Sequence, residues 1–465
     1  MRSKFRTAAI IIFTLLAGLL VAGIAYLGFD LYLQNQITAP IQGADASSIE
    51  EISFSDTKVA EEAEKEQNKD GKKTEKAETD SSGLTKDAVD AKNKKDKKNK
   101  AGAKKKATAT PKPTPTPAPS KPEDVKDIST HDMKKYLGEM PGEGLDIVST
   151  ATEIYTYEQM VKDLFFLEQR YPDLFTYETV AVTKDLRQIY AVTLGNPKAP
   201  NHVVVQYTVH SREYINCLLA MKQIENYLKN FAAGNTYGDR SYQDLFSNFC
   251  LHVIPMANPD GIAVAQFGID SMRTEAARAT IQYCWESDTL LGRTAAPIET
   301  YLKTFKANAN GVDLNKNFDV GWKEYTDGVP VPSTDCHKGA APASEKETQA
   351  ILKLVHDNPT VAVISYHSAG NLIYWNYGVE NEDLLAADRN LAANLCNVTG
   401  YPTVVSEKYD SHLAGGCSDY FMWKEGIPAV TLETGTGTCP LSITEYDAIW
   451  NANRDVYPLL AAMYG

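Results

Sequence analysis

The chain has 465 residues, of which 43% are hydrophobic and 23% are charged, a composition that suits a large globular core with additional segments. Its formal net charge is −13 at pH 7, and this acidic balance argues against a nucleic-acid partner. None of the seven cysteines forms a Cys-x-x-Cys pair, which argues against a cysteine zinc site or a thioredoxin-like redox motif.

The N-terminal segment has the pattern of a membrane anchor. Residues 1–6 are basic, and residues 8–29 carry no charge over a length that can span a bilayer as a helix. The basic flank predicts that the N-terminus stays in the cytoplasm and that the remainder is exported. We therefore assign residues 1–34 to a single-pass anchor in the cell membrane. The alternative is a cleaved signal peptide, with a small-residue site at residues 23–25, and a secreted protein.

Residues 35–135 have the composition of a disordered linker. Between residues 58 and 106, Lys, Glu, Asp and Ala dominate, and too few large apolar side chains are present to offset the entropy of folding. Residues 108–120 are rich in Pro and Thr, which predicts an extended polyproline-type spacer. We interpret this segment as a passive stalk. Binding of its lysines to an anionic wall or lipid surface is the alternative.

Regular patterns follow, so residues 136–465 form one predicted folded domain. Residues 157–171 and 217–231 have the apolar spacing of helices, and residues 262–307 read as helix plus loop. Short apolar runs predict strands at residues 177–182, 188–194, 203–209, 249–256, 361–366 and around 430–433. Strands that alternate with helices indicate an α/β fold, with a mixed, mostly parallel twisted sheet flanked by helices.

The strand predicted at residues 203–209 ends on His210, and Glu213 follows three residues later. The end of a strand is a rigid support for an exposed loop, and α/β proteins often place their chemistry there. An imidazole and a carboxylate at this spacing can bind one zinc ion, which needs a third protein ligand for catalysis. His-x-x-Glu is a weak motif by itself. The alternative is that His210 ends the strand and Glu213 begins the next helix as a solvated acid.

Four further motifs follow His210-Ser-Arg-Glu213 in the chain. They are Asn258-Pro-Asp-Gly261, Gly311-Val-Asp-Leu-Asn-Lys-Asn-Phe318, Ser365-Tyr-His-Ser368 and Thr431-Leu-Glu-Thr-Gly435. In this order the motifs resemble those of the zinc metallocarboxypeptidase family typified by carboxypeptidase A, over roughly residues 150–465. The run from His367 to Trp375 and the later Cys439-Pro-Leu are similar to the bacterial γ-D-glutamyl-diaminopimelate peptidase branch of that family.

The resemblance implies a carboxypeptidase-like fold and one catalytic Zn²⁺ per domain, bound by His210, Glu213 and His367. It also implies that Glu433 is the general base. A carboxylate in an apolar strand seldom occurs without a partner or a task, so a structural ion pair of Glu433 is the alternative.

Four cationic or polar residues are implied to contact the substrate. Arg212 and Lys306 would stabilise the developing oxyanion, and Arg293 competes with Lys306 for this role. Asn315 and Lys316 would hold a substrate carboxylate. The family usually has Arg at the second of these positions, and Lys keeps the charge but loses the bidentate fork.

The specificity pocket is implied by Ala-Gly-Gly at residues 414–416. Ser418 would lie at its floor, which favours a polar or zwitterionic substrate side chain. The mobile tyrosine of the family would fall at Ser411 and is absent there. Together with Lys316, this departure points away from a digestive carboxypeptidase.

The remaining histidines and cysteines receive structural interpretations. His252 lies inside a predicted strand and reads as a core histidine, whereas His202 reads as a surface residue. A family cysteine is common at the position of Cys336, but its usual partner position is not Cys here. We suggest Cys284 as the disulfide partner of Cys336 instead. The Ser344 hydroxyl is expected to cap the helix that begins near residue 345.

These features predict an exported, membrane-tethered zinc peptidase with a monomeric catalytic domain, which hydrolyses peptidoglycan stem peptides or muropeptides. Two alternatives remain. One is a broad metallocarboxypeptidase that removes C-terminal residues from peptides. The other is an inactive module that binds wall peptides.

Overall fold

The computed structural model describes residues 138–152, 154–326, 328–406 and 415–465. The predicted anchor at residues 1–34 and the predicted linker at residues 35–135 lie outside these residues. Ser411 and the first residue of the 414–416 motif lie outside them as well. Within the described part of the chain, no helix is both long enough and apolar enough to cross a bilayer.

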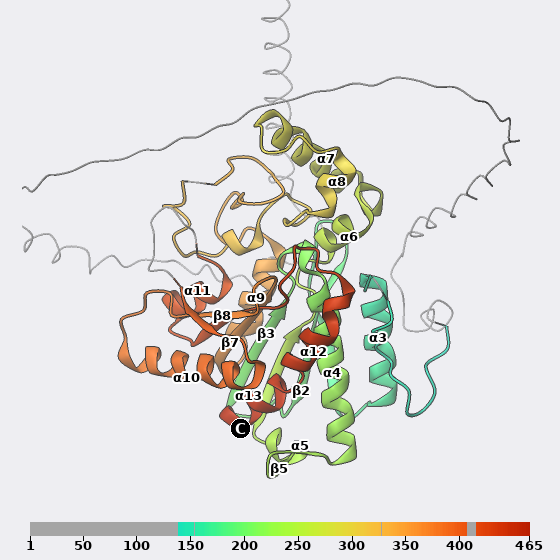
Figure 1. Cartoon of the computed structure of the whole chain (residues 1–465), viewed down its shortest axis with the longest axis vertical. Coiled ribbons are helices and arrows are strands. Elements are labelled where there is room, and N and C mark those ends of the chain that lie inside the picture. The colour runs from blue at the N-terminus through green and yellow to red at the C-terminus, as the bar shows by residue number, and fades with distance from the viewer. Residues whose placement is uncertain (1–137, 153, 327, 407–414) are drawn as a thin grey trace, which may run out of the picture. The chain divides into compact units, whose positions relative to one another are not determined.

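An eight-stranded mixed sheet forms the centre of the fold, and helices lie around it (Figure 1). The strand order is β1-β2-β6-β3-β7-β10-β8-β9. The strands are β1 (Phe175–Val182), β2 (Gln188–Gly195), β3 (Asn201–Tyr207), β6 (Phe249–Ile254), β7 (Thr360–His367), β8 (Leu372–Trp375), β9 (Thr403–Val405) and β10 (Ala429–Glu433). The central strands β6, β3, β7 and β10 are parallel to one another. β1 and β2 extend one side and β8 the other by antiparallel pairing, and β9 is parallel to β8. The mixed, mostly parallel sheet is confirmed.

Helices cover both faces of this sheet because successive strand residues point to opposite sides. On β3, Val203 and Val205 belong to one apolar core, whereas Val204 belongs to another. The first core also contains side chains of α3 (Tyr157–Arg170), α4 (Ile215–Ala233), α10 (Glu382–Thr399), α12 (Tyr446–Asn453) and α13 (Val456–Tyr464). The second core contains side chains of α9 (Lys346–His356) and α11 (Cys417–Tyr420).

A third, smaller apolar cluster is built by helices between β6 and β7. It comprises side chains of α6 (Pro259–Phe267), α7 (Glu275–Leu290) and α8 (Ile298–Lys303), and Figure 1 shows α7 and α8 beside each other. Helix plus loop was expected for this region, which the structure confirms. The remaining short elements are α5 (Tyr242–Leu245), β4 (Thr236–Tyr237), β5 (Arg240–Ser241), η1 (Ser211–Glu213), η2 (Ile269–Ser271), η3 (Leu314–Lys316), η4 (Phe421–Glu425) and η5 (Ile443–Glu445).

All seven cysteines are free thiols, so the suggested disulfide between Cys284 and Cys336 is wrong. Cys284 is buried on α7 among the apolar side chains of the third cluster. Cys336 lies in a loop, where its backbone N–H donates to the Asp313 carboxylate at 3.1 Å and its carbonyl accepts from Val329 at 3.0 Å. The two cysteines are therefore held in different surroundings.

Candidate active site

Three parallel strands end at the same edge of the sheet and carry the predicted catalytic residues there. His367 is the last residue of β7, Glu433 is the last residue of β10, and the strand register places these two opposite each other. The neighbouring strand β3 ends at Tyr207, two residues earlier than predicted, because Thr208 has a φ of 63° that a strand does not accommodate. The chain then turns through His210 into η1, which contains Glu213.

His210, Glu213 and His367 converge at this edge, as predicted. The Nδ1 atom of His210 lies 2.9 Å from Oε1 of Glu213 and 3.0 Å from Nδ1 of His367. The Nδ1 atom of His367 lies 3.2 Å from Oε2 of Glu213. All three side chains are buried, at 2–5% exposure.

This donor set fits a zinc ion. In a tetrahedral site with zinc–nitrogen bonds of about 2.0 Å, two nitrogen ligands lie about 3.3 Å apart. The two Nδ1 atoms are close to this spacing, and the Glu213 carboxylate completes a set of two nitrogens and one oxygen acceptor. Burial would raise the pKa of Glu213, but the two imidazoles outweigh burial and lower it, so the carboxylate is ionised. Two imidazoles and an ionised carboxylate are ligands of the kind that catalytic zinc uses.

Asp313 is a candidate functional residue that the sequence pattern does not reveal. Its fully buried carboxylate lies 3.3 Å from Nε2 of His210 and 3.4 Å from Nζ of Lys306. It also accepts hydrogen bonds from the backbone N–H groups of Asn315 and Cys336. Burial opposes ionisation, yet these cationic and polar partners hold the Asp313 pKa well below its ordinary value. A carboxylate behind a ligand histidine orients the ring and increases its basicity. The only signal in the sequence was an acid inside the motif at residues 311–318.

Glu433 lies beside the predicted zinc ligand His367, opposite it in the strand register, in a partly buried position. Burial raises its pKa to about 7, and the Glu213 carboxylate acts in the same direction, whereas His367 and Lys306 oppose the shift. A carboxyl group that titrates near neutral pH is suited to accept and return a proton. No Lys or Arg among the described residues forms an ion pair with Glu433, which does not support the structural alternative.

Lys306 and Arg293, the two cations that compete for the oxyanion role, have different surroundings. Lys306 is mostly buried next to Asp313, and burial would lower its pKa, but Asp313 and Glu213 raise it, so the amine stays charged. Arg293 pairs with Asp288 and Asp335 instead and does not take this role.

Arg212 lies on η1 between the two zinc ligands His210 and Glu213. The buried Nε atom of Arg212 has no hydrogen-bond partner in the described part of the protein. The Arg212 charge lowers the pKa of Lys306 slightly against the larger effects of Asp313 and Glu213. Contact of Arg212 and Lys306 with an oxyanion stays a prediction.

Asn315 and Lys316 lie on η3, directly after Asp313. The Asn315 amide oxygen accepts a hydrogen bond from the backbone N–H of Cys417 at 3.0 Å. Its side chain fills the space beside Gly416, where a Cβ atom would lie 2.4 Å from the Asn315 oxygen. Glycine at this position therefore allows the second half of the predicted pocket motif to pack against Asn315. Lys316 lies with its Nζ 5.6 Å from the ring centre of Tyr325.

Ser418 is buried on α11, and its hydroxyl is engaged within the fold. It donates to the carbonyl of Val430 at 2.9 Å and accepts from the Thr431 hydroxyl at 2.9 Å. These bonds tie α11 to β10. Contact of Ser418 with a substrate stays a prediction. The neighbouring Asp419, which the sequence reasoning did not single out, accepts from the Gly416 N–H at 2.7 Å and thereby fixes the start of α11.

A closed hydrogen-bond network supports the site from behind. Asn216, at the start of α4, donates to the Ser368 hydroxyl at 3.0 Å and accepts from the Thr434 hydroxyl at 2.7 Å. The Ser368 and Thr434 hydroxyls lie 2.9 Å apart. Ser368 follows the ligand His367, Thr434 follows Glu433, and the Ser368 N–H donates to Glu213 at 3.1 Å. The network thus links Ser368, which follows His367, to Thr434, which follows Glu433.

Comparison with known proteins identifies the family. Residues 160–454, more than half of the chain, match the model described as zinc carboxypeptidase (Peptidase_M14). The chain belongs to the zinc carboxypeptidase family. It is a zinc metallopeptidase, and the family's catalytic zinc suits the ligand set described above.

Two curated relatives and one solved structure illustrate the range of this zinc carboxypeptidase's similarities. Gamma-D-glutamyl-L-diamino acid endopeptidase 1 of Lysinibacillus sphaericus is 27% identical over 67% of this chain and 72% of its own length. Carboxypeptidase B of Rattus norvegicus is 24% identical over 55% of this chain and 57% of its own length. The crystal structure of thrombin activatable fibrinolysis inhibitor superposes with a TM-score of 0.51 at 16% identity, covering 69% of this chain and 77% of that one. The structural match confirms the carboxypeptidase fold.

Proposed function

We propose that this zinc carboxypeptidase hydrolyses peptide bonds in peptidoglycan stem peptides on the outer side of the cell membrane. The observation that carries the substrate class is the relative from Lysinibacillus sphaericus, whose name describes an endopeptidase for γ-D-glutamyl-L-diamino acid bonds. The apolar run at residues 8–29 and the long linker that follows favour a catalytic domain tethered to the membrane and able to reach an insoluble wall.

The residues around the zinc ligands supply a complete set of roles for peptide hydrolysis. Bound zinc supplies Lewis-acid polarisation of the scissile carbonyl and makes water more acidic. Glu433, with a pKa of about 7, accepts a proton from the attacking water and delivers it to the leaving amine. Lys306 and Arg212 place positive charge where the oxyanion develops. Asp313 keeps His210 and Lys306 in position.

Recognition of the substrate is assigned to η3 and α11. Asn315 and Lys316 would hold a substrate carboxylate and so set which bond is cleaved. A lysine at this position binds a carboxylate as a point charge rather than through the two parallel hydrogen bonds of an arginine. The loss of the bidentate contact argues against a digestive carboxypeptidase, which depends on tight binding of the C-terminal carboxylate.

The test compares the full-length protein with Glu433→Gln on defined stem peptides and on ordinary peptides with a free C-terminus, with products read by mass. A surface variant, Glu382→Gln at the exposed start of α10, is the matched control. Release of fragments that contain the diamino acid by the wild type and the control, but not by Glu433→Gln, is the expected result.

Other outcomes separate the alternatives. Cleavage of ordinary C-terminal residues alone would keep the chemistry and overturn the wall substrate, leaving a broad metallocarboxypeptidase. Binding of muropeptides by a zinc-containing protein that cleaves neither substrate would indicate the inactive module. The convergence of His210, Glu213 and His367 beside Glu433 argues against that module.

A further inference from the structure

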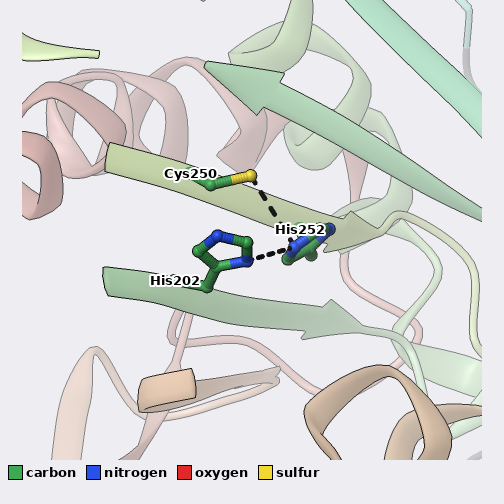
Figure 2. Close-up of side chains that lie close together, drawn as sticks. All are labelled: His202, Cys250 and His252. Carbon is green, nitrogen blue, oxygen red and sulfur yellow. Dashed lines mark hydrogen bonds between the residues drawn. The ribbon is translucent and has the colours of Figure 1, made fainter. Parts of the chain in front are cut away.

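A second group of metal-ligating side chains lies at the opposite end of the central strands. His202 is the second residue of β3, and Cys250 and His252 lie on the adjacent parallel strand β6 (Figure 2). The register places His202 opposite Cys250, and residues two apart on a strand point to the same face. At about 3.3 Å per residue, His202 lies roughly 20 Å from His210. The group is therefore separate from the catalytic site.

His202 was expected at the surface, and this expectation is wrong. It is 2% exposed, Cys250 is fully buried and His252 is 5% exposed. β6 pairs with one side of β3, β7 pairs with the other, and the His202 N–H donates to the carbonyl of Pro359. Pairing on both sides buries the start of β3 despite its polar sequence.

The three side chains have the spacing of a metal site. The Nδ1 atom of His202 lies 2.9 Å from Nε2 of His252, and the Cys250 sulfur lies 3.7 Å from the same Nε2. In a tetrahedral zinc site, two nitrogen ligands lie about 3.3 Å apart, and a nitrogen and a sulfur lie about 3.6 Å apart. The observed distances approach both values. Figure 2 shows the ligand atoms of all three residues directed toward one another.

The outer nitrogens of both rings are anchored in the way that metal-ligating histidines require. The Nε2 atom of His202 lies 3.1 Å from the carbonyl of Ala199, and Nδ1 of His252 lies 3.1 Å from the Thr193 hydroxyl. Such partners fix the ring orientation and leave the other nitrogen for the metal. Here the remaining nitrogens, Nδ1 of His202 and Nε2 of His252, face each other and the thiol.

We propose that His202, Cys250 and His252 form a second zinc site, distinct from the catalytic one, that ties β3 to β6. Two imidazoles and a thiolate are ligands of the borderline-soft kind that zinc prefers.

Binding changes the protons of the site in a defined way. The ring proton of His252 moves to Nδ1, where it donates to the Thr193 oxygen, and His202 keeps its proton on Nε2 toward Ala199. Cys250 releases its thiol proton to solvent as the zinc–sulfur bond forms. Without a metal, the same residues form only a chain of hydrogen bonds in which His252 donates to His202.

Zinc content and cobalt absorption of the full-length protein distinguish a metal-bound second site from a metal-free chain of hydrogen bonds. The wild type is expected to bind two zinc ions per chain. After replacement of zinc by Co²⁺, it should show thiolate-to-cobalt charge-transfer absorption in the near ultraviolet. The catalytic ligands include no sulfur, so this absorption reports the second site alone and requires no enzymatic activity.

Variants assign the signal to named residues. Cys250→Ala and the smaller change Cys250→Ser should each lose one zinc and the absorption. Cys284→Ala, which removes another buried thiol, should keep both. His367→Gln should lose the catalytic zinc and keep the absorption, so that failure of either site is recognised by itself. One zinc per chain and no thiolate absorption in the folded wild type would overturn the proposal.

Discussion

The Asp313 carboxylate lies 3.3 Å from Nε2 of His210, on the side of the ring away from Glu213. Asp313 therefore acts on the metal through a ligand rather than by contact with it. We expect Asp313→Asn to weaken zinc binding by about 10- to 100-fold, because a neutral amide is a weaker acceptor for the His210 N–H and leaves the ring less basic. Competition with a chromophoric chelator measures this change directly.

Asp319→Asn is the control for that measurement. Asp319 follows the same motif but is half exposed, and its carboxylate pairs with Lys424 on the surface at 3.6 Å. It should leave the zinc dissociation constant unchanged. Equal zinc affinity in Asp313→Asn and the wild type would show that the carboxylate has no role in holding the metal.

Lys306 is expected to act on the reaction rather than on substrate binding. Lys306→Met removes the cation beside Asp313 and should lower kcat by about 100-fold or more, with a small change in KM, since its charge is needed mainly in the transition state. Lys306→Arg should retain much more activity. Lys303→Met, at the exposed end of α8, is the control. A change confined to KM would instead assign Lys306 to ground-state binding.

Glu347 predicts a pH dependence of stability. It is buried on α9, and burial, with the Glu345 and Asp260 carboxylates nearby, raises its pKa to about 8. Unfolded, the same group titrates near 4.3. The folded state therefore holds the proton more tightly, and the stabilisation from this group is complete below about pH 4 and lost as pH rises to about 8. Glu347→Gln cannot ionise, so its stability relative to wild type should increase with pH, by at most about 1.4 kcal/mol per unit.

Urea unfolding of both proteins between pH 5 and 8 measures this difference. Glu299→Gln on the exposed surface of α8 should follow the wild type at every pH. A constant difference between Glu347→Gln and the wild type across the range would show that Glu347 does not change its ionisation on folding.

The parts of the site that were predictable lie at the ends of apolar strands. His210, His367 and Glu433 each end or follow such a run, which places them at strand ends, and the family resemblance supplied their roles as ligands and base. Asp313 was missed because its role depends on a loop that folds back against His210. Neither its neighbours in sequence nor any periodicity reveal that contact.

The predictions for His202 and Ser344 also failed because of contacts between residues far apart in the sequence. The sequence predicts His202 at the surface, but pairing of β3 on both sides buries it. The Ser344 hydroxyl was expected to cap α9, yet it donates to the Glu345 carboxylate at 2.7 Å, and Glu345 is the residue that precedes the helix. Glu345 in turn accepts from Asn308, a contact made across 37 residues. Long-range polar contacts override local capping preferences here.

The network of Asn216, Ser368 and Thr434 gives the last prediction. Thr434→Val keeps the shape of the side chain but removes its hydroxyl, which leaves the Asn216 carbonyl oxygen without its donor in a fully buried position. Loss of one partner of a buried polar group costs about 1–3 kcal/mol, so the free energy of unfolding should fall by that amount. Because Thr434 follows Glu433 and its N–H donates to the carbonyl of His367, kcat should fall as well. Thr436→Val, two residues later and exposed, should change neither quantity. A Thr434→Val protein as stable and as active as the wild type would mean that strand pairing alone holds the ends of β7 and β10 in place.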